Sequence, residues 1–295
     1  MALTINTNMA SMLVQRNMNA STSALNQAIQ RMTTGYRINS AKDDAAGMAV
    51  AIKLDTQLGA YDIASQNVQM GSAMLTTAEE NQNLVLGHLQ RVRDLAEQAA
   101  NGVYDSTSQE AIAAEIDARI AEVNRLTNSV EFNGIKLLDG TAGTVNVQVG
   151  IDGTTNSAID ISTALFSTTT TGTDMLGATY GSTAAGTASG GHKIVEAALS
   201  TVAATKQAVF DQIDTAIGTV KGGITAIGSY QNRLDSATES IEVARSNIAS
   251  ALSTVRDADV STESSNYIKA QILQQAAASL LTTANQSPSI ALNLI

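Results

Sequence analysis

The fold is decided by the stretch from Val50 to Ala99, which reads VAIKLDTQLGAYDIASQNVQMGSAMLTTAEENQNLVLGHLQRVRDLAEQA. Two rows of positions interleave along it at alternating steps of three and four: Leu54, Tyr61, Val68, Leu75, Gln82, Leu89 and Ala96, and Val50, Gln57, Ala64, Gly71, Ala78, Val85, Val92 and Ala99. Twelve of these fifteen positions are apolar, and the exceptions are Gln57, Gly71 and Gln82. A heptad seam held this long predicts a coiled coil. The helix, expected from residue 43 to about 100, would be roughly 85 Å long.

Further helices are expected on both sides of this one. A helix over about 105–129 carries Ile112, Ile116, Ile120, Val123 and Leu126 on one side. A second long helix is expected from near Ile194, with a partner seam of Phe210, Ile213, Ile217, Val220, Ile224 and Ile227 that continues, after one slip, from Tyr230 to Ala258. Because glycine is costly inside a helix, Gly222, Gly223 and Gly228 predict a close crossing or a local break.

The two ends of the chain are amphipathic. A helix over roughly 5–33 has Leu25, Ile29 and Met32 on one face, and the turn-prone segment after Gly35 ends it. A helix over about 262–285 has one apolar face, and Pro288 is expected just beyond its end. That face consists of Ile268, Ile272, Leu273, Ala276, Ala277, Leu280, Leu281 and Ala284.

Residues 139–191 differ in kind from the helical segments. Of these 53 residues, 28 are Gly, Thr or Ser, and none is Lys or Arg. Val145, Val147 and Val149 alternate with polar residues, which predicts a strand, and Ile159 and Ile161 indicate another. The predicted fold class is therefore mainly α, a long coiled-coil-like helical bundle with a small β-hairpin region in the middle.

Composition excludes several classes of function. The net charge of -10 opposes non-specific nucleic-acid binding, and the absence of Cys removes disulfides and thiol chemistry. The only histidines, His88 and His192, form no metal or catalytic pattern, so we predict no enzyme activity, no metal and no cofactor. No run of 18 apolar residues predicts a membrane span. The acid-free N-terminus also has the composition of a transit peptide, but its pattern continues past Gly35 without a break.

Both ends are depleted in charge. Residues 1–42 contain four basic residues and no acid, and the last 36 residues carry only Glu263 and Lys269. Short one-sided helices are unstable alone in water, and a large exposed apolar face marks an interaction surface. Identical subunits that meet head-to-tail form a helical filament by default. We therefore predict a homopolymer whose termini are disordered in the monomer and fold in the assembly, packing through Leu25, Ile29, Met32, Ile268, Ile272, Leu273, Ala276, Leu280 and Leu281.

Two terminal motifs resemble a known family. Residues 30–47, QRMTTGYRINSAKDDAAG, are similar to the N-terminal signature of bacterial flagellins, and residues 265–276, SNYIKAQILQQA, are similar to the C-terminal one. The resemblance covers about 1–150 and 220–295. It implies a structural subunit of the extracellular flagellar filament, which serves motility. It assigns 1–42 and 260–295 to an inner helical layer, 43–138 and 192–259 to an outer one, and 139–191 to a short variable region.

The resemblance also implies partners. These are the flagellar type III export apparatus, a chaperone that holds the C-terminal helix, and the filament cap and hook-junction proteins. Residues 89–98, LQRVRDLAEQ, resemble the patch that a vertebrate Toll-like receptor binds in some flagellins, and Gln90, Arg91, Leu95 and Glu115 match it. The other interpretation of these residues is a solvated helix face or a contact with the next subunit.

Two alternative functions remain at this stage. The seams alone would suit a cytosolic coiled-coil scaffold, although its ends would more often be polar. A hook–filament junction protein shares the terminal helices, but the match at 30–47 and 265–276 favours the filament subunit.

Overall fold

The computed structural model describes residues 8–140, 142–165, 190–199 and 203–292. The chain divides into two compact units, which we treat separately. The terminal unit comprises residues 1–59 and 245–295, and the central unit comprises residues 60–244. The fold is mainly α-helical with two small antiparallel strand pairs, which confirms the predicted fold class.

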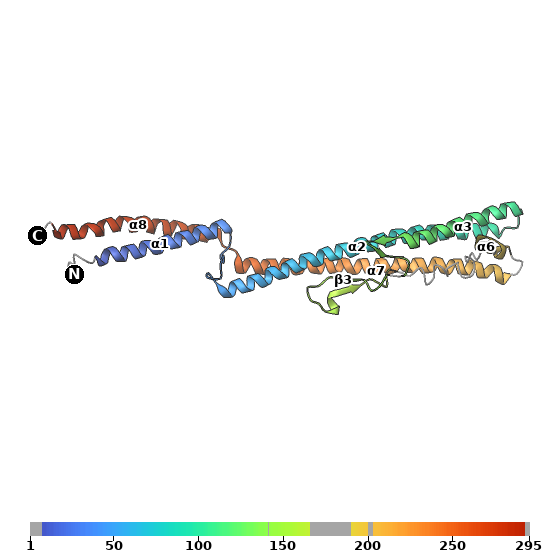
Figure 1. Cartoon of the computed structure of the whole chain (residues 1–295), viewed down its shortest axis with the longest axis horizontal. Coiled ribbons are helices and arrows are strands. Elements are labelled where there is room, and N and C mark those ends of the chain that lie inside the picture. Colours follow the sequence, from blue (N-terminus) through green and yellow to red (C-terminus); the bar gives the residue numbers. More distant parts are fainter. Residues whose placement is uncertain (1–7, 141, 166–189, 200–202, 293–295) are drawn as a thin grey trace. The chain divides into compact units, whose positions relative to one another are not determined.

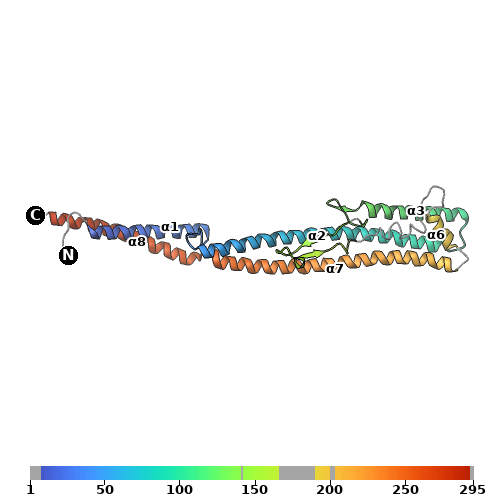
Figure 2. The same ribbon diagram turned by 60° about the horizontal axis from the view of Figure 1, so that its bottom comes forward.

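Two helices pair in the terminal unit, α1 (Met9–Thr34) and α8 (Val260–Leu292), and Figures 1 and 2 show them side by side. Asn8 caps α1, because its side-chain oxygen accepts a hydrogen bond from the Ser11 amide at 3.1 Å. Gly35 ends the helix with a φ of 75°, a conformation that glycine adopts at little steric cost. The predicted helix over 5–33 agrees with α1 from Met9 onward, and residues 5–7 lie outside the described part.

A short segment after Gly35 is tied to the end of α7 (Ala203–Arg256). The Arg37 amide donates to the Arg256 carbonyl at 2.7 Å, and the Ala258 amide donates to the Gly35 carbonyl at 2.9 Å. The Arg256 guanidinium also lies 3.9 Å from the centre of the Tyr36 ring, where a cation–π attraction acts. These contacts place the end of α1 beside the start of α8.

The long helix α2 (Ala45–Ala99) buries its predicted seam in the central unit. The buried members there are Ala64, Val68, Gly71, Leu75, Ala78, Gln82, Val85, Leu89, Val92, Ala96 and Ala99. The facing seam of α7 buries Ile213, Ile217, Val220, Ile227, Leu234 and Ile241. Gly71 lies near Leu234, and Gln82 lies near Gly223, so α2 and α7 are antiparallel. The coiled-coil prediction is confirmed here, although Val50 in the terminal unit is exposed.

Two shorter helices complete the helical part of the central unit. Helix α3 (Ser106–Ser129) is capped by Asp105, and α6 (Gly190–Ala198) packs against it. The prediction of one helix from near Ile194 is wrong, because α6 ends at Ala198 and α7 begins at Ala203. Helical periodicity alone cannot distinguish one helix from two successive ones, since both place apolar residues at the same spacing. Ile194 and Val195 belong to the same buried cluster as Ile116 of α3.

Two other helix predictions are resolved by the structure. Helix α8 continues to Leu292, so the prediction that it ends before Pro288 is wrong. Proline lacks the amide hydrogen that would bond the Ala284 carbonyl, and that carbonyl instead accepts a hydrogen bond from Asn8 Nδ2 at 2.8 Å. Helix α7 runs unbroken through Gly222, Gly223 and Gly228. Of these, Gly223 marks a close crossing, whereas Gly222 and Gly228 have open space where a Cβ would stand.

The strands form two small antiparallel pairs. The first pairs β1 (Glu131–Phe132) with β2 (Ile135–Lys136) across the Asn133–Gly134 turn. The second pairs β3 (Asn146–Gln148) with β4 (Ala158–Asp160), joined through a 3-10 turn at Thr155–Ser157. Val147 and Ile159 face each other in this pair and are buried, which confirms the predicted hairpin. Residues 166–189 of the segment rich in Gly, Thr and Ser lie outside the described residues.

None of the helices in the described ranges combines the length and the apolar content that a membrane span requires. None of the described His, Asp and Glu side chains gather into a group of three or more that could hold a metal ion.

Candidate assembly surface

The contact between α1 and α8 is made of small residues. Ala28 of α1 and Ala270 and Ala277 of α8 are buried there. Side-chain hydrogen bonds join the two helices at three levels: Gln274 Nε2 donates to Thr22 Oγ1 at 3.0 Å, Asn8 Nδ2 to the Ala284 carbonyl at 2.8 Å, and Ser11 Oγ to Asn285 Oδ1 at 2.8 Å. Alanine contacts let the helix axes approach closely, but each one buries little apolar area.

An ion pair closes the contact near the start of α8. Arg31 Nη1 lies 3.0 Å from Glu263 Oε1, and Glu263 is only 7% exposed. Asp259 begins α8 by accepting hydrogen bonds from the Ser261 amide and the Thr262 hydroxyl. The Thr262 bond is the main reason that the pKa of Asp259 lies below its usual value.

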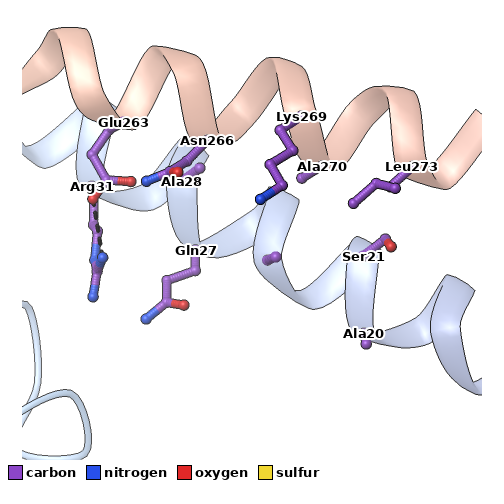
Figure 3. A pocket seen from close by; sticks show the side chains of 11 residues that line it. Ala20, Ser21, Gln27, Ala28, Arg31, Glu263, Asn266, Lys269, Ala270 and Leu273 are labelled. Carbon is purple, nitrogen blue, oxygen red and sulfur yellow. Dashed lines mark hydrogen bonds and ion pairs between the residues drawn. The ribbon is translucent and has the colours of Figure 1, made fainter.

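A groove lies between the two helices beside this ion pair. It encloses about 370 Å³ and is lined by polar and small side chains, among them Ser21, Gln27, Asn266 and Lys269. Figure 3 shows Arg31 and Glu263 facing each other across the two ribbons, with Lys269 extending from α8 toward α1. The groove has an apolar rim at Leu273, which is half exposed.

Several large aliphatic side chains of α8 are exposed to solvent. Ile268, Ile272, Ala276 and Leu280 repeat every fourth residue along α8, and we call them the aliphatic face of α8. All four are exposed, with Ile272 at 59% and Leu280 at 58%. Ala28, Ala270 and Ala277 are thus buried while Ile268, Ile272 and Leu280 face solvent, the reverse of an ordinary helix pair. An apolar surface of this kind marks an interaction site.

The predicted packing residues are all exposed or half-buried. Ile29 and Met32 of α1 and Ile268, Ile272, Leu273, Ala276 and Leu280 of α8 are exposed, and Leu25 and Leu281 are half-buried. Three more exposed residues were missed by the sequence analysis, Met9, Met12 and Leu13 on α1. Their spacing of three and four residues was a sufficient signal, and the same periodicity test would have found them.

The second predicted site lies on α2 and α3 in the central unit. Arg91 Nε and Glu115 Oε1 form an ion pair at 3.0 Å, and Gln90 is exposed beside them. The hydrogen bond from Arg91 is the main cause that lowers the pKa of Glu115. Leu95, in contrast, is 1% exposed and packs in the core, so it can support this surface only from beneath.

Comparison with known proteins gives matches at both ends of the chain. The model of the bacterial flagellin N-terminal helical region matches residues 5–143, and that of the C-terminal helical region matches residues 210–295. A flagellin of Halalkalibacterium halodurans is 32% identical over 99% of both chains. Polar flagellin F of Vibrio parahaemolyticus is 29% identical over the whole of both chains.

Two further matches are more limited. B-type flagellin of Pseudomonas aeruginosa is 46% identical over 162 residues, which are 55% of this chain and 33% of that protein. A solved structure from Vibrio parahaemolyticus, assigned as a flagellar hook-associated protein, is similar with a TM-score of 0.57 and 16% identity. It covers 73% of this chain and all of that one, and at this identity the likeness concerns the fold alone.

Proposed function

Because this chain belongs to the bacterial flagellin family and is a structural subunit of the flagellar filament, we propose that its α1–α8 pair is the surface through which copies pack. The proposal rests on the burial pattern of the pair: Ala28, Ala270 and Ala277 are buried, whereas the aliphatic face of α8 is exposed. Burial of such side chains releases about 1.5–3 kcal/mol each. Neighbouring copies can supply that burial.

We further propose that this pair is stable only when neighbouring copies cover it. The contact within one chain rests on alanines, three hydrogen bonds and one ion pair among the described residues. Helices of this kind are marginal in water without packing of their apolar face. In this proposal the inner layer consists of residues 1–42 and 260–295, which fold on assembly. Residues 43–138 and 192–259 form the outer layer, with the variable region 139–191 between them.

The exposed side chains of α8 also support the proposed partners. An apolar helix face has to be shielded before assembly, so we propose that an export chaperone holds α8 until the chain leaves through the flagellar type III apparatus. The filament cap and the hook-junction proteins would meet the same terminal helices. The flagellar filament formed by relatives lies outside the cell, and we place this chain there in a non-enzymatic role.

A second function is favoured by the ion pair on α2 and α3. Gln90, Arg91 and Glu115 present a polar surface whose charges are held in place by the 3.0 Å contact. We propose that a vertebrate Toll-like receptor binds there. Arg91→Asp is expected to abolish receptor signalling and to leave filament formation intact. Loss of filaments with unchanged signalling would instead assign Arg91 to a contact between subunits.

The hook–filament junction alternative has less support. The solved hook-associated structure is similar in fold, so the fold does not separate the two functions. The relatives that match over their full length are flagellins. Copy number in the assembled flagellum separates them directly, because a junction protein forms a short ring and a filament subunit is present along the whole filament.

The assembly proposal is tested by placing one charge on the aliphatic face. Ile272→Asp is expected to prevent growth from filament seeds, seen by electron microscopy, because a buried unpaired carboxylate is strongly unfavourable. Val103→Asp is the matched control, since Val103 is 85% exposed in the turn after α2. Normal filaments from Ile272→Asp would refute the proposal. Limited proteolysis of free and polymerised protein tests folding on assembly, and residues 1–40 should resist cleavage only in filaments.

A further inference from the structure

A polar layer interrupts the apolar seam between α2 and α7. Gln82 of α2 is 1% exposed, and neither its Oε1 nor its Nε2 has a hydrogen-bond partner among the described residues. Buried polar side chains are nearly always paired. This amide is therefore an exception that the filament function alone does not explain.

A glycine faces the amide end of Gln82, and a side chain in its place would force that amide to shift. A Cβ on Gly223 would lie 2.6 Å from Gln82 Oε1 and 3.1 Å from Nε2, which is closer than side chains pack. Glycine costs helix stability in the interior of α7. Both residues of the layer are thus unfavourable by themselves, and each is accommodated by the other.

The layer stands between the two hydrophobic clusters of the central unit. One cluster contains α2 residues from Val85 onward and buried α7 residues up to Val220. The other contains α2 residues up to Ala78 and α7 residues from Ile227 onward. Gln82 and Gly223 lie between the buried members of the two clusters in both helices, and half-buried Ile224 beside Gly223 packs against the first cluster.

This match is specific to one alignment of the helices. Gly71 of α2 faces Leu234 of α7. Gln82 lies 11 residues after Gly71, and Gly223 lies 11 residues before Leu234, so the two contacts belong to the same antiparallel alignment. A slip of one heptad would bring Gln82 against Ala216 or Tyr230 and would leave Gly223 against a leucine. The other buried seam contacts between α2 and α7 are apolar, so this is the one level among the described residues where a buried polar side chain meets the facing helix.

We propose that Gln82 and Gly223 form a register lock that selects the alignment of α2 against α7. A polar residue at a single seam position is a known means of specifying register, and it lowers stability. The chain keeps the unpaired amide for its selectivity, although an apolar side chain there would make the central unit more stable. This inference concerns folding of the central unit and holds whether or not the α1–α8 pair is the assembly surface.

A double-mutant cycle tests the fit between the two residues. Gly223→Ala alone should raise the Tm of the full chain by less than a Gly→Ala change inside a helix normally does, because the Gln82 amide has to shift to make room. In a Gln82→Ala background the same change should raise the Tm by more, since alanine favours the helix and the clash is gone. Gln82→Met, which keeps the shape and removes the amide, should raise the Tm by about 3 °C.

Cysteine trapping tests the register itself, and the natural chain contains no Cys. Arg93 Nε and Asp214 Oδ1 lie 2.7 Å apart and join α2 to α7, so Arg93→Cys with Asp214→Cys reports the native alignment. Arg93→Cys with Lys221→Cys or with Gln207→Cys reports a slip of seven residues in either direction. Each pair is refolded from guanidinium and treated with a short bis-maleimide.

With Gln82 and Gly223 present, only the native pair should cross-link within one chain. In the Gln82→Ala/Gly223→Ala background a slipped pair should cross-link as well. The register lock is overturned if that background still traps the native pair alone. It is also overturned if Gly223→Ala changes the Tm equally in both backgrounds, or if Gln82→Met lowers the Tm.

Discussion

Removal of the Glu263 carboxylate is expected to weaken filament assembly by a predictable amount. In Glu263→Ala the Arg31 guanidinium keeps its place between α1 and α8 without its partner 3.0 Å away. The side chain of Arg31 is 24% exposed, so water reaches it only in part. Arg31 Nε is already buried without a partner, which leaves this guanidinium little alternative hydrogen bonding.

The loss of assembly free energy in Glu263→Ala can be estimated from the distance between the two charges and from their burial. At 3.0 Å and an effective dielectric constant of about 20, the attraction is roughly 5.5 kcal/mol. Desolvation of the two charges offsets part of this gain, and breaking a fully buried pair costs about 3–5 kcal/mol. Because Arg31 is partly solvated, we expect Glu263→Ala to weaken the free energy of assembly by about 2 kcal/mol. If pairing is coupled to assembly, this loss raises the critical concentration for polymerisation by roughly 30-fold.

The assay is the concentration of free subunit that remains in equilibrium with seeded filaments. The exchange Arg31→Glu/Glu263→Arg should recover most of the lost affinity, because it restores the pair in reverse. Glu122→Ala removes a carboxylate from the exposed pair with Arg125 and should change the critical concentration by less than about twofold. The reasoning is refuted if Glu263→Ala polymerises as the natural chain does, or if the exchange is as defective as the single variant.

Two more outcomes follow from the structure. The pKa of Asp259 is lowered chiefly by the Thr262 hydroxyl, so its contribution to stability is complete above the ordinary value of 3.8 and is lost as the pH falls through the lower folded value. Asp259→Asn should therefore assemble less well than the natural chain at pH 7, and the gap should close in acid; a constant gap would contradict this. In the central unit, Gly71→Ala places a Cβ 2.7 Å from Val147 Cγ2 and should cost about 1–3 kcal/mol of unfolding free energy in urea. Gly87→Ala, which meets open space in the same helix, should stabilise by about 0.5–1 kcal/mol, and equal effects of the two would refute the packing argument.

The site was predicted less completely than the fold. Periodicity identified the apolar residues of α8, and the structure shows that Ile272 and Leu280 are exposed. The same periodicity does not reveal which part of an apolar face packs against the partner helix. In α8 the buried residues are Ala270 and Ala277. A motif match does not reveal burial either, because it selected Leu95 as a surface residue and the fold buries this side chain.

The amino-acid sequence by itself determined the long helices, the hairpin and the family. Each of these depends on local repetition: the heptad seam of α2, the alternating valines before β3, and two terminal motifs. Only the tertiary structure decided what each face packs against. The Arg31–Glu263 pair and the meeting of Gln82 with Gly223 both join segments far apart in the chain. Periodicity records that a side chain is buried, whereas the partner depends on the relative placement of two helices.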